Sequence, residues 1–204
     1  MVEQDATQNT MTLNQDRIER PLTREEQIAL KNKRTGITVF QISWILVFVC
    51  LVVVYFQMRS EQVTWPPAGV QPAALLPGLL ATAALFASAA LVWRGLKTAR
   101  AGHLHGLMQQ WLIALALGAA FVVIAGAQWS AMSGDNAYGM VFRVMVGYHL
   151  LHAIVIGIYM AAVLRSVRAG HVTVRDLWPA EAGARLWYFV VAAWVLFFVP
   201  LYLV

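Results

Sequence analysis

Residues Gly147–Gly157 read Gly-Tyr-His-Leu-Leu-His-Ala-Ile-Val-Ile-Gly and lie inside an apolar run from about residue 138 to residue 164. A run of that length can cross a bilayer, for which about 20 apolar residues suffice. His149 and His152 are three residues apart, so they lie on one face of the helix. Polar side chains at this depth are costly and normally face other helices or a polar cavity. This face is predicted to contact protein, either through interhelical hydrogen bonds or in a metal or haem site.

The composition of the chain indicates a membrane protein. Of its 204 residues, 60% are apolar and 12% are charged, which is typical of a polytopic membrane protein. The single cysteine excludes an intrachain disulfide and a cysteine-based metal site. The net charge of +5 is concentrated beside the apolar runs, which indicates membrane topology rather than binding to nucleic acid. The predicted fold class is all-α, with five transmembrane helices.

Five apolar runs define the predicted spans, at about 36–57, 72–93, 107–129, 138–164 and 184–204. Residues 1–34 form a polar segment with too few apolar residues for a core, followed by a transmembrane domain over 35–204. Thr23-Arg-Glu-Glu is a possible capping box. It predicts a short surface-lying helix that ends near Lys33.

The basic residues predict the orientation. They gather before the first span, between the second and third spans, and between the fourth and fifth spans. The positive-inside rule therefore puts the N-terminus in the cytoplasm and the C-terminus outside. Bases near an anionic leaflet attract lipid headgroups, and a tryptophan before two prolines suits headgroup depth. The predicted lipid-binding residues are Trp65, Arg94, Lys97, Arg100, Arg165 and Arg168.

Small residues recur at helical spacing within the spans. Ala84 and Ser88 are four apart in the second span, and Ala114 and Gly118 are four apart in the third. Such stripes let helices approach closely. Arg143 is the one base inside a span, shallow enough to reach the outer interface, where Asp135 or a partner could neutralise it.

The polar residues within the spans predict a structural role. His149 and His152 project from the same face and cannot hold opposite sides of one iron, and His103 and His105 lack a third ligand at suitable spacing. No catalytic, cofactor or metal site is predicted in this chain. We expect both helix histidines to be neutral and to bond to another helix or to a neighbouring backbone carbonyl. The residues predicted to be structural or interhelical polar groups are His149, His152, Glu181 and Trp187.

Three motifs in order resemble one family. The first is Trp65-Pro-Pro-Ala-Gly-Val-Gln-Pro72 before an alanine-rich helix, and the second is Gly147-Tyr-His-Leu-Leu-His152 with Gly157. The third is Glu181 followed by Leu186-Trp-Tyr-Phe-Val190 and Trp194. Together they resemble cytochrome c oxidase subunit III in the five-span form of bacterial haem-copper oxidases, from the first span onwards. Residues 1–34 lie outside this resemblance.

The resemblance implies a non-catalytic subunit beside a core subunit, subunit I, that carries haem and copper and reduces oxygen while protons are moved. Members of the family carry no redox metal and bind phospholipid in a cleft between the first two helices and the other three. They also steady the core subunit and its proton-uptake entrance. The implied location is the inner membrane of a bacterium.

Four positions depart from the family pattern. Trp44 and Gln128 stand where the family commonly has glutamate, Tyr188 where it has histidine, and Val191 where it has aspartate. A role in proton uptake that needs those groups is not expected here, whereas lipid binding and scaffolding need none of them.

Three other interpretations remain open from the sequence. One is an accessory subunit, related to subunit III, of a nitric oxide reductase. Another is a haem- or quinone-binding membrane subunit that uses His149 and His152 together with a partner chain. The third is a standalone transporter, although the spans lack an aligned path of acidic or polar residues.

Overall fold

The computed structural model of the chain describes residues 23–174 and 176–204, and these form helices and connecting loops. The helices are α2 (Arg24–Ser60), α3 (Leu75–Arg100), α4 (Leu104–Ala131), α5 (Ala137–Arg168) and α6 (Trp178–Phe198), followed by the π-helical turn η1 (Val199–Leu203). The described part contains five helices long and apolar enough to span a membrane, which confirms the predicted fold class. The chain divides into two units, residues 1–37 and 38–204. The first 22 residues of the predicted polar segment lie outside the description.

The capping box at Thr23 is present. The Thr23 backbone N–H donates to Glu26 Oε2 at 2.9 Å, and the Glu26 N–H donates to Thr23 Oγ1 at 3.3 Å, which satisfies two N–H groups at the helix start. The prediction that this helix ends near Lys33 is wrong, because α2 is unbroken from Arg24 to Ser60. No proline or helix-terminating cap lies between the charged residues and the apolar run, so the helix continues.

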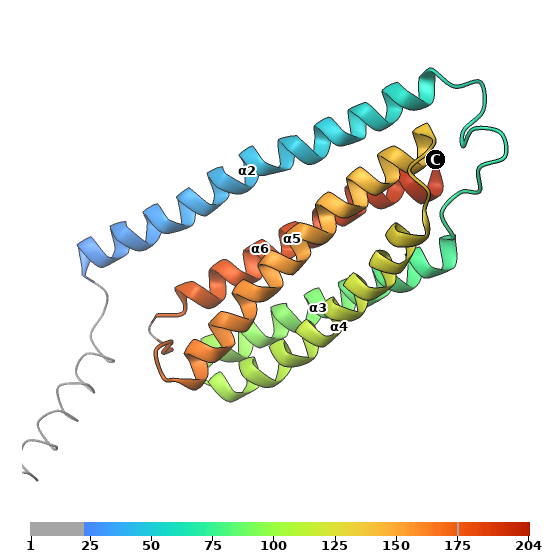
Figure 1. The fold of residues 1–204 in the computed structure, drawn as a ribbon. Coiled ribbons are helices and arrows are strands. Elements are labelled where there is room, and N and C mark those ends of the chain that lie inside the picture. Colours follow the sequence, from blue (N-terminus) through green and yellow to red (C-terminus); the bar gives the residue numbers. More distant parts are fainter. Residues whose placement is uncertain (1–22, 175) are drawn as a thin grey trace, which may run out of the picture. The chain divides into compact units, whose positions relative to one another are not determined.

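Helices α3, α4, α5 and α6 form a four-helix bundle, and Figure 1 shows α3 beside α4 and α5 beside α6. The closest approach is between α3 and α4, where Ser88 Oγ donates to the Ala114 carbonyl at 2.9 Å. A side chain as short as serine reaches a neighbouring backbone only where two helices lie close together, which facing small residues allow. The predicted small-residue stripes of the second and third spans thus meet in one interface.

Three fully buried tryptophans fill the bundle, and glycines make room for two of them. The Trp187 ring from α6 would lie 2.7 Å from a Cβ placed on Gly118 of α4. The Trp111 ring from α4 would lie 2.6 Å from a Cβ placed on Gly95 of α3. Both distances are shorter than real Cβ contacts, so these glycines are required by packing.

From residue 38 onwards, α2 joins the bundle differently. Its buried residues are Phe48 and Tyr55, and it meets the other helices through aromatic rings and side-chain hydrogen bonds, such as that of Gln41 Nε2 to the Arg185 carbonyl at 2.9 Å, rather than by close backbone approach. Phe48 packs edge-on against Phe189 of α6, with ring centroids 5.5 Å apart. The expected division into the first two helices and the remaining three is therefore wrong for this chain. The small residues of α3 let its backbone approach that of α4 closely. The large apolar residues of α2 keep its backbone farther from those of the other helices.

Candidate functional site

The histidine face of α5 lies at the junction of α2, α4 and α6. His149 is fully buried, and its ring lies 5.3 Å from the Trp194 ring, 5.5 Å from Phe121 and 6.1 Å from Phe48, measured between centroids. Neither ring nitrogen has a hydrogen-bond partner within the described part of the chain. The prediction that His149 bonds to another helix or to a neighbouring backbone carbonyl is therefore wrong. The facing helices present aromatic rings at this level, and ring packing takes its place.

His152 lies one turn along the same face. Its Nδ1 lies 2.6 Å from the Tyr148 carbonyl, so a proton on Nδ1 completes a hydrogen bond within α5. The imidazole packs against two rings of α2, at 4.5 Å from Trp44 and 5.2 Å from Phe48. This histidine thus uses a neighbouring backbone carbonyl, one of the two arrangements that the sequence predicted. Its ring forms part of the surface that α2 covers.

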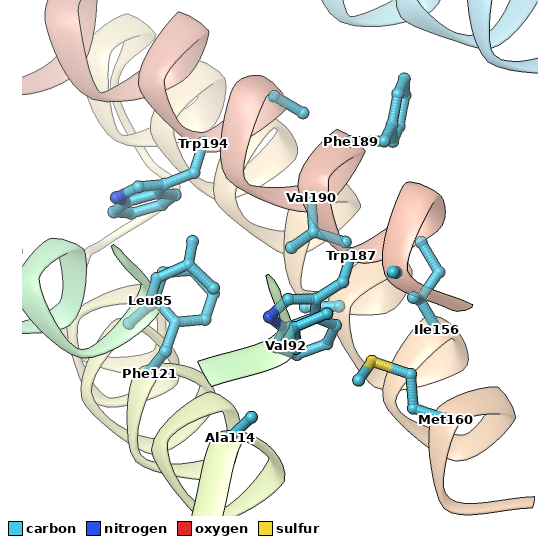
Figure 2. Close-up of a cluster of buried hydrophobic side chains, with 14 of the residues drawn as sticks. Leu85, Val92, Ala114, Phe121, Ile156, Met160, Trp187, Phe189, Val190 and Trp194 are labelled. Atoms are coloured by element: carbon cyan, nitrogen blue, oxygen red, sulfur yellow. The ribbon is translucent and has the colours of Figure 1, made fainter. Parts of the chain in front are cut away.

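Trp187 connects three helices. Its Nε1–H donates to Ser88 Oγ of α3 at 2.8 Å, and the same hydroxyl donates to the Ala114 carbonyl of α4 at 2.9 Å. Figure 2 shows Trp187 and Trp194 extending from α6 towards α3 and α4, while Phe189 points to the other side of α6. Each buried indole N–H needs an acceptor, and here one hydroxyl serves as acceptor and donor.

A second indole repeats this arrangement nearer the other end of α6. Trp194 Nε1–H donates to Thr82 Oγ1 of α3 at 2.8 Å, and the threonine hydroxyl donates to the Gly78 carbonyl. Sequence reasoning assigned Ser88 to close packing and missed that the hydroxyls of Ser88 and Thr82 act as acceptors. The available signal was the seven-residue spacing of Trp187 and Trp194, which puts two buried N–H groups on one face of α6.

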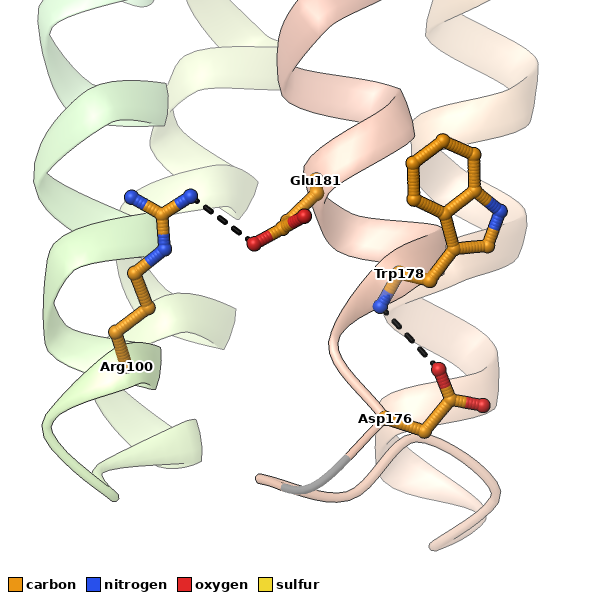
Figure 3. A network of polar contacts seen from close by, with 4 residues as sticks. All are labelled: Arg100, Asp176, Trp178 and Glu181. Atoms are coloured by element: carbon orange, nitrogen blue, oxygen red, sulfur yellow. Dashed lines mark hydrogen bonds and ion pairs between the residues drawn. The ribbon is translucent and has the colours of Figure 1, made fainter. Parts of the chain in front are cut away.

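Glu181 pairs with Arg100 at one end of the bundle. Glu181 lies in the first turn of α6, and its Oε1 is 3.1 Å from Nη2 of Arg100 at the end of α3 (Figure 3). The glutamate side chain is 10% exposed and the arginine side chain 58%. In the preceding loop, Asp176 Oδ1 accepts the Trp178 backbone N–H at 3.4 Å. The ion pair ties the end of α3 to the start of α6.

The predicted lipid-binding residues lie at both ends of the bundle. Lys97, Arg165 and Arg168 are exposed in the last turns of α3 and α5, at the same end as Arg100, and Arg94 is exposed about one turn before Lys97. We call this end the basic end. We call the opposite end, where the α2–α3 and α4–α5 loops lie, the loop end. Trp65 lies at the loop end, where its Nε1–H donates to the Tyr55 hydroxyl at 2.8 Å. These positions leave lipid binding as a prediction.

The structure shows the surroundings of the four residues that depart from the family pattern. Trp44 stacks on Phe189 at 5.7 Å, and Gln128 bonds through Nε2 to the Ala74 carbonyl and through Oε1 to the Tyr202 hydroxyl. Val191 is partly buried, and the Tyr188 hydroxyl is buried with no hydrogen-bond partner among the described residues. At the first two positions, the residues present make contacts between helices.

The polar side chains of this site act mainly by holding helices together. Residues 23–174 and 176–204 hold no group of three or more His, Cys, Asp or Glu side chains placed to bind a metal ion. Indole, hydroxyl, amide and carboxylate groups instead bond from one helix to the next. Fold and site together define a multi-pass membrane protein whose polar groups link its helices.

Comparison with known proteins gives the family. A model of the family described as cytochrome c oxidase subunit III matches residues 20–204. The chain belongs to the cytochrome c oxidase subunit III family, as the resemblance predicted. The match begins at residue 20, so the expectation that residues 1–34 lie wholly outside the family is wrong for its last part.

Individual relatives agree with the family match. Cytochrome c oxidase subunit 3 of Tragelaphus oryx is 27% identical over 184 residues, which cover 86% of this chain and 70% of the relative. The subunit 3 of the fungus Podospora anserina is 28% identical over 182 residues, covering 84% and 67%. The subunit 3 of Sus scrofa is 27% identical over 184 residues, covering 86% and 70%.

Proposed function

We propose that this chain is a non-catalytic integral subunit of a haem-copper terminal oxidase in the inner membrane of a bacterium. It stabilises the core subunit, subunit I, and binds phospholipid between its helices. The observation that carries the proposal is the family match over residues 20–204. Haem and copper belong to partner subunits, and this chain supplies a surface of packed helices. Oxygen reduction is then the activity of the complex rather than of this chain.

The packing supports a scaffolding role. The bundle is tied internally by indole–hydroxyl bonds and by the Arg100–Glu181 pair. Its outward residues include large apolar side chains, such as Ile158 at 65% exposed and Val123 at 70% exposed. A rigid bundle with an apolar exterior suits contact with lipid and with another membrane subunit.

The lipid-binding part of the proposal rests on the basic end. Arg94, Lys97, Arg165 and Arg168 are exposed there, and each base near an anionic leaflet contributes about 1 kcal/mol of attraction. The proposed acyl-chain region is the seam between α2 and the bundle. Side chains bridge that seam, and the two backbones do not approach closely along it.

The haem- or quinone-binding alternative gains no support from the geometry. His149 is enclosed by aromatic rings, and His152 is 5% exposed with Nδ1 directed at the Tyr148 carbonyl. An external ligand therefore has no open route to His149. The relatives reported above are named as oxidase subunits, which favours an oxidase over a nitric oxide reductase.

Purification of the tagged chain in mild detergent tests the proposal. Mass spectrometry of the co-purified chains and a reduced-minus-oxidised spectrum identify the partner. We expect a haem-copper core subunit and oxygen-consuming activity that nitric oxide does not replace as substrate. A nitric oxide-reducing core, or a coloured chain without partners, would contradict the proposal.

A further inference from the structure

Arg143 carries a permanent charge inside a membrane-spanning helix. It is the seventh residue of α5, so its Cα lies about 9 Å along the helix from the first residue, at a rise of 1.5 Å per residue. Side chains on a helix lean towards its N-terminus, which here is the loop end. A carbon placed as Cβ on Gly134, in the loop before α5, would lie 3.5 Å from Arg143 Nη1. The guanidinium therefore reaches the depth of the α4–α5 loop.

The contacts around this guanidinium are aromatic rather than acidic. It lies over the Trp129 ring of α4, with Cζ 4.9 Å from the ring centroid, and the Trp129 Nε1–H donates to the Arg143 carbonyl at 2.9 Å. The indole of Trp129 thus contacts both the guanidinium and the backbone carbonyl of Arg143. A cation–π contact uses the face of the guanidinium and leaves the N–H donors along its edge available to another partner.

No carboxylate within residues 23–174 and 176–204 lies within 4 Å of the Arg143 guanidinium. Two acids at the loop end are engaged elsewhere. Asp135 Oδ2 accepts the Ser133 hydroxyl at 2.6 Å, and Glu61 Oε1 accepts Gln57 Nε2 at 3.2 Å. Neutralisation of Arg143 by Asp135, considered from the sequence, is therefore not seen. A guanidinium at the depth of the loop can instead donate hydrogen bonds to an anionic group at the membrane interface.

The surface beside Arg143 faces out of the bundle. Met140 and Val144, on either side of it in α5, are 52% and 51% exposed, and both are apolar. The order of these groups matches that of a phospholipid. The guanidinium and the indole lie at the depth of the phosphate, and the apolar residues lie at the depth of the acyl chains.

We propose that Arg143 and Trp129 form a binding site for the phosphodiester group of a membrane phospholipid at the loop end. The planar guanidinium donates two hydrogen bonds to the phosphate, and the indole fixes its orientation. The acyl chains lie on the outward surface that includes Met140 and Val144. This site is at the opposite end of the bundle from the basic residues in the proposed function, and it does not depend on them.

Native mass spectrometry of the full chain, purified with its partners and washed in detergent, tests the site. We expect the wild type to retain one more phospholipid than Arg143→Gln, and Asp135→Asn, a charge change at the same end, to match the wild type. Equal retention by the wild type and Arg143→Gln would overturn the proposal. So would unchanged lipid with loss of a partner subunit from Arg143→Gln, because that result assigns the guanidinium to a partner's carboxylate.

Two further arms complete the test. For delipidated wild-type chain, we expect both phosphatidylglycerol and phosphatidylcholine to raise the thermal midpoint, and inorganic phosphate to leave it unchanged. A rise with phosphate alone would overturn a lipid source.

If Arg143→Gln does not fold, Arg143→Lys decides the question, since it keeps the charge but loses the planar fork. The lysine variant should release the phospholipid at lower collision energy than the wild type, and equal release would overturn the site. Either failure leaves co-purification with an oxidase core unaffected.

Discussion

The four-helix bundle and α2 are both apolar and helical, yet they are held by different contacts. In the bundle, small residues bring α3 and α4 together, and two indole N–H groups of α6 bond to hydroxyls of α3. From residue 38 onwards, α2 buries Phe48 and Tyr55 and is attached by ring packing and by hydrogen bonds of Gln41 and Arg59 to backbone carbonyls at the two ends of the last helix. Lipid tails are as apolar as leucine, so ring packing gains little over contact with lipid, and the hydrogen bonds that join α2 to the bundle are exposed or only partly buried. We therefore infer that α2 separates from the bundle more readily than the bundle helices separate from one another.

The largest expected effect comes from filling the space that a bundle glycine leaves. Gly118→Leu places atoms where the buried Trp187 ring lies, 2.7 Å from the new Cβ, and neither the ring nor the facing helices can yield freely. We expect a loss of about 3 kcal/mol in the free energy of unfolding, at the upper end of overpacking effects. Titration with a denaturing detergent measures it. Gly126→Leu is the matched control on the same helix, because the nearest atom there is 4.0 Å from the Cβ position.

Release of α2 should follow from removing its buried ring. Phe48→Ala deletes contacts with Tyr148, His152 and Phe189 and lowers the stability of α2 docking by about 2 kcal/mol, less than in a water-soluble core because lipid replaces part of the contact. Amide hydrogen exchange should increase within 40–56 while α3 to α6 stay protected. Phe56→Ala, at a ring 45% exposed, is the control. Equal loss of protection in all five helices would remove the distinction between the two regions.

The indole–hydroxyl bonds are expected to contribute less individually. Ser88→Ala leaves the buried Trp187 N–H without its acceptor and should cost about 1 kcal/mol, since membrane hydrogen bonds are weaker than their burial suggests. The same detergent titration detects it. Ser130→Ala, an exposed serine bonded only within α4, should change nothing. If the two variants behave alike, the bundle is held by packing without help from this bond.

The smallest effect is expected at the basic end. Glu181→Gln removes the Arg100 ion pair, but the arginine side chain is 58% exposed, so the cost should be below about 1 kcal/mol and should shrink as salt is added. Comparing unfolding at low and high ionic strength measures this dependence. Glu61→Gln, an exposed acid at the loop end, is the control. A salt-independent loss at position 181 would point to a role other than charge pairing.

Some of this comparison could be predicted from sequence, and some could not. The five spans follow from length and hydropathy, which a bilayer constrains tightly. Close packing at Ser88 and Ala114 follows from small side chains at helical spacing. The hydroxyl acceptors of Trp187 and Trp194 do not follow, because serine and threonine count as small residues until the facing helix is known.

The histidine face shows the same limit more sharply. Its burial could be predicted, since imidazoles are costly in lipid, and both histidines are in fact buried. The partner of each could not be predicted, because it depends on which side chains the adjacent helices present at that height. His149 meets aromatic rings, while His152 finds a carbonyl of its own helix. The guanidinium–indole contact of Arg143 was missed for the same reason, because Trp129 comes from a different helix.

In the function proposed above, this chain stabilises an oxidase core without taking part in its chemistry. Purifying the complex with and without the chain, and following its haem spectrum and oxygen consumption during incubation in detergent, tests this most directly. We predict equal haem content and equal initial rates, with faster loss of activity in the complex that lacks the chain. If a haem band or the initial rate of oxygen consumption disappears when the chain is removed, the proposed non-catalytic role is contradicted.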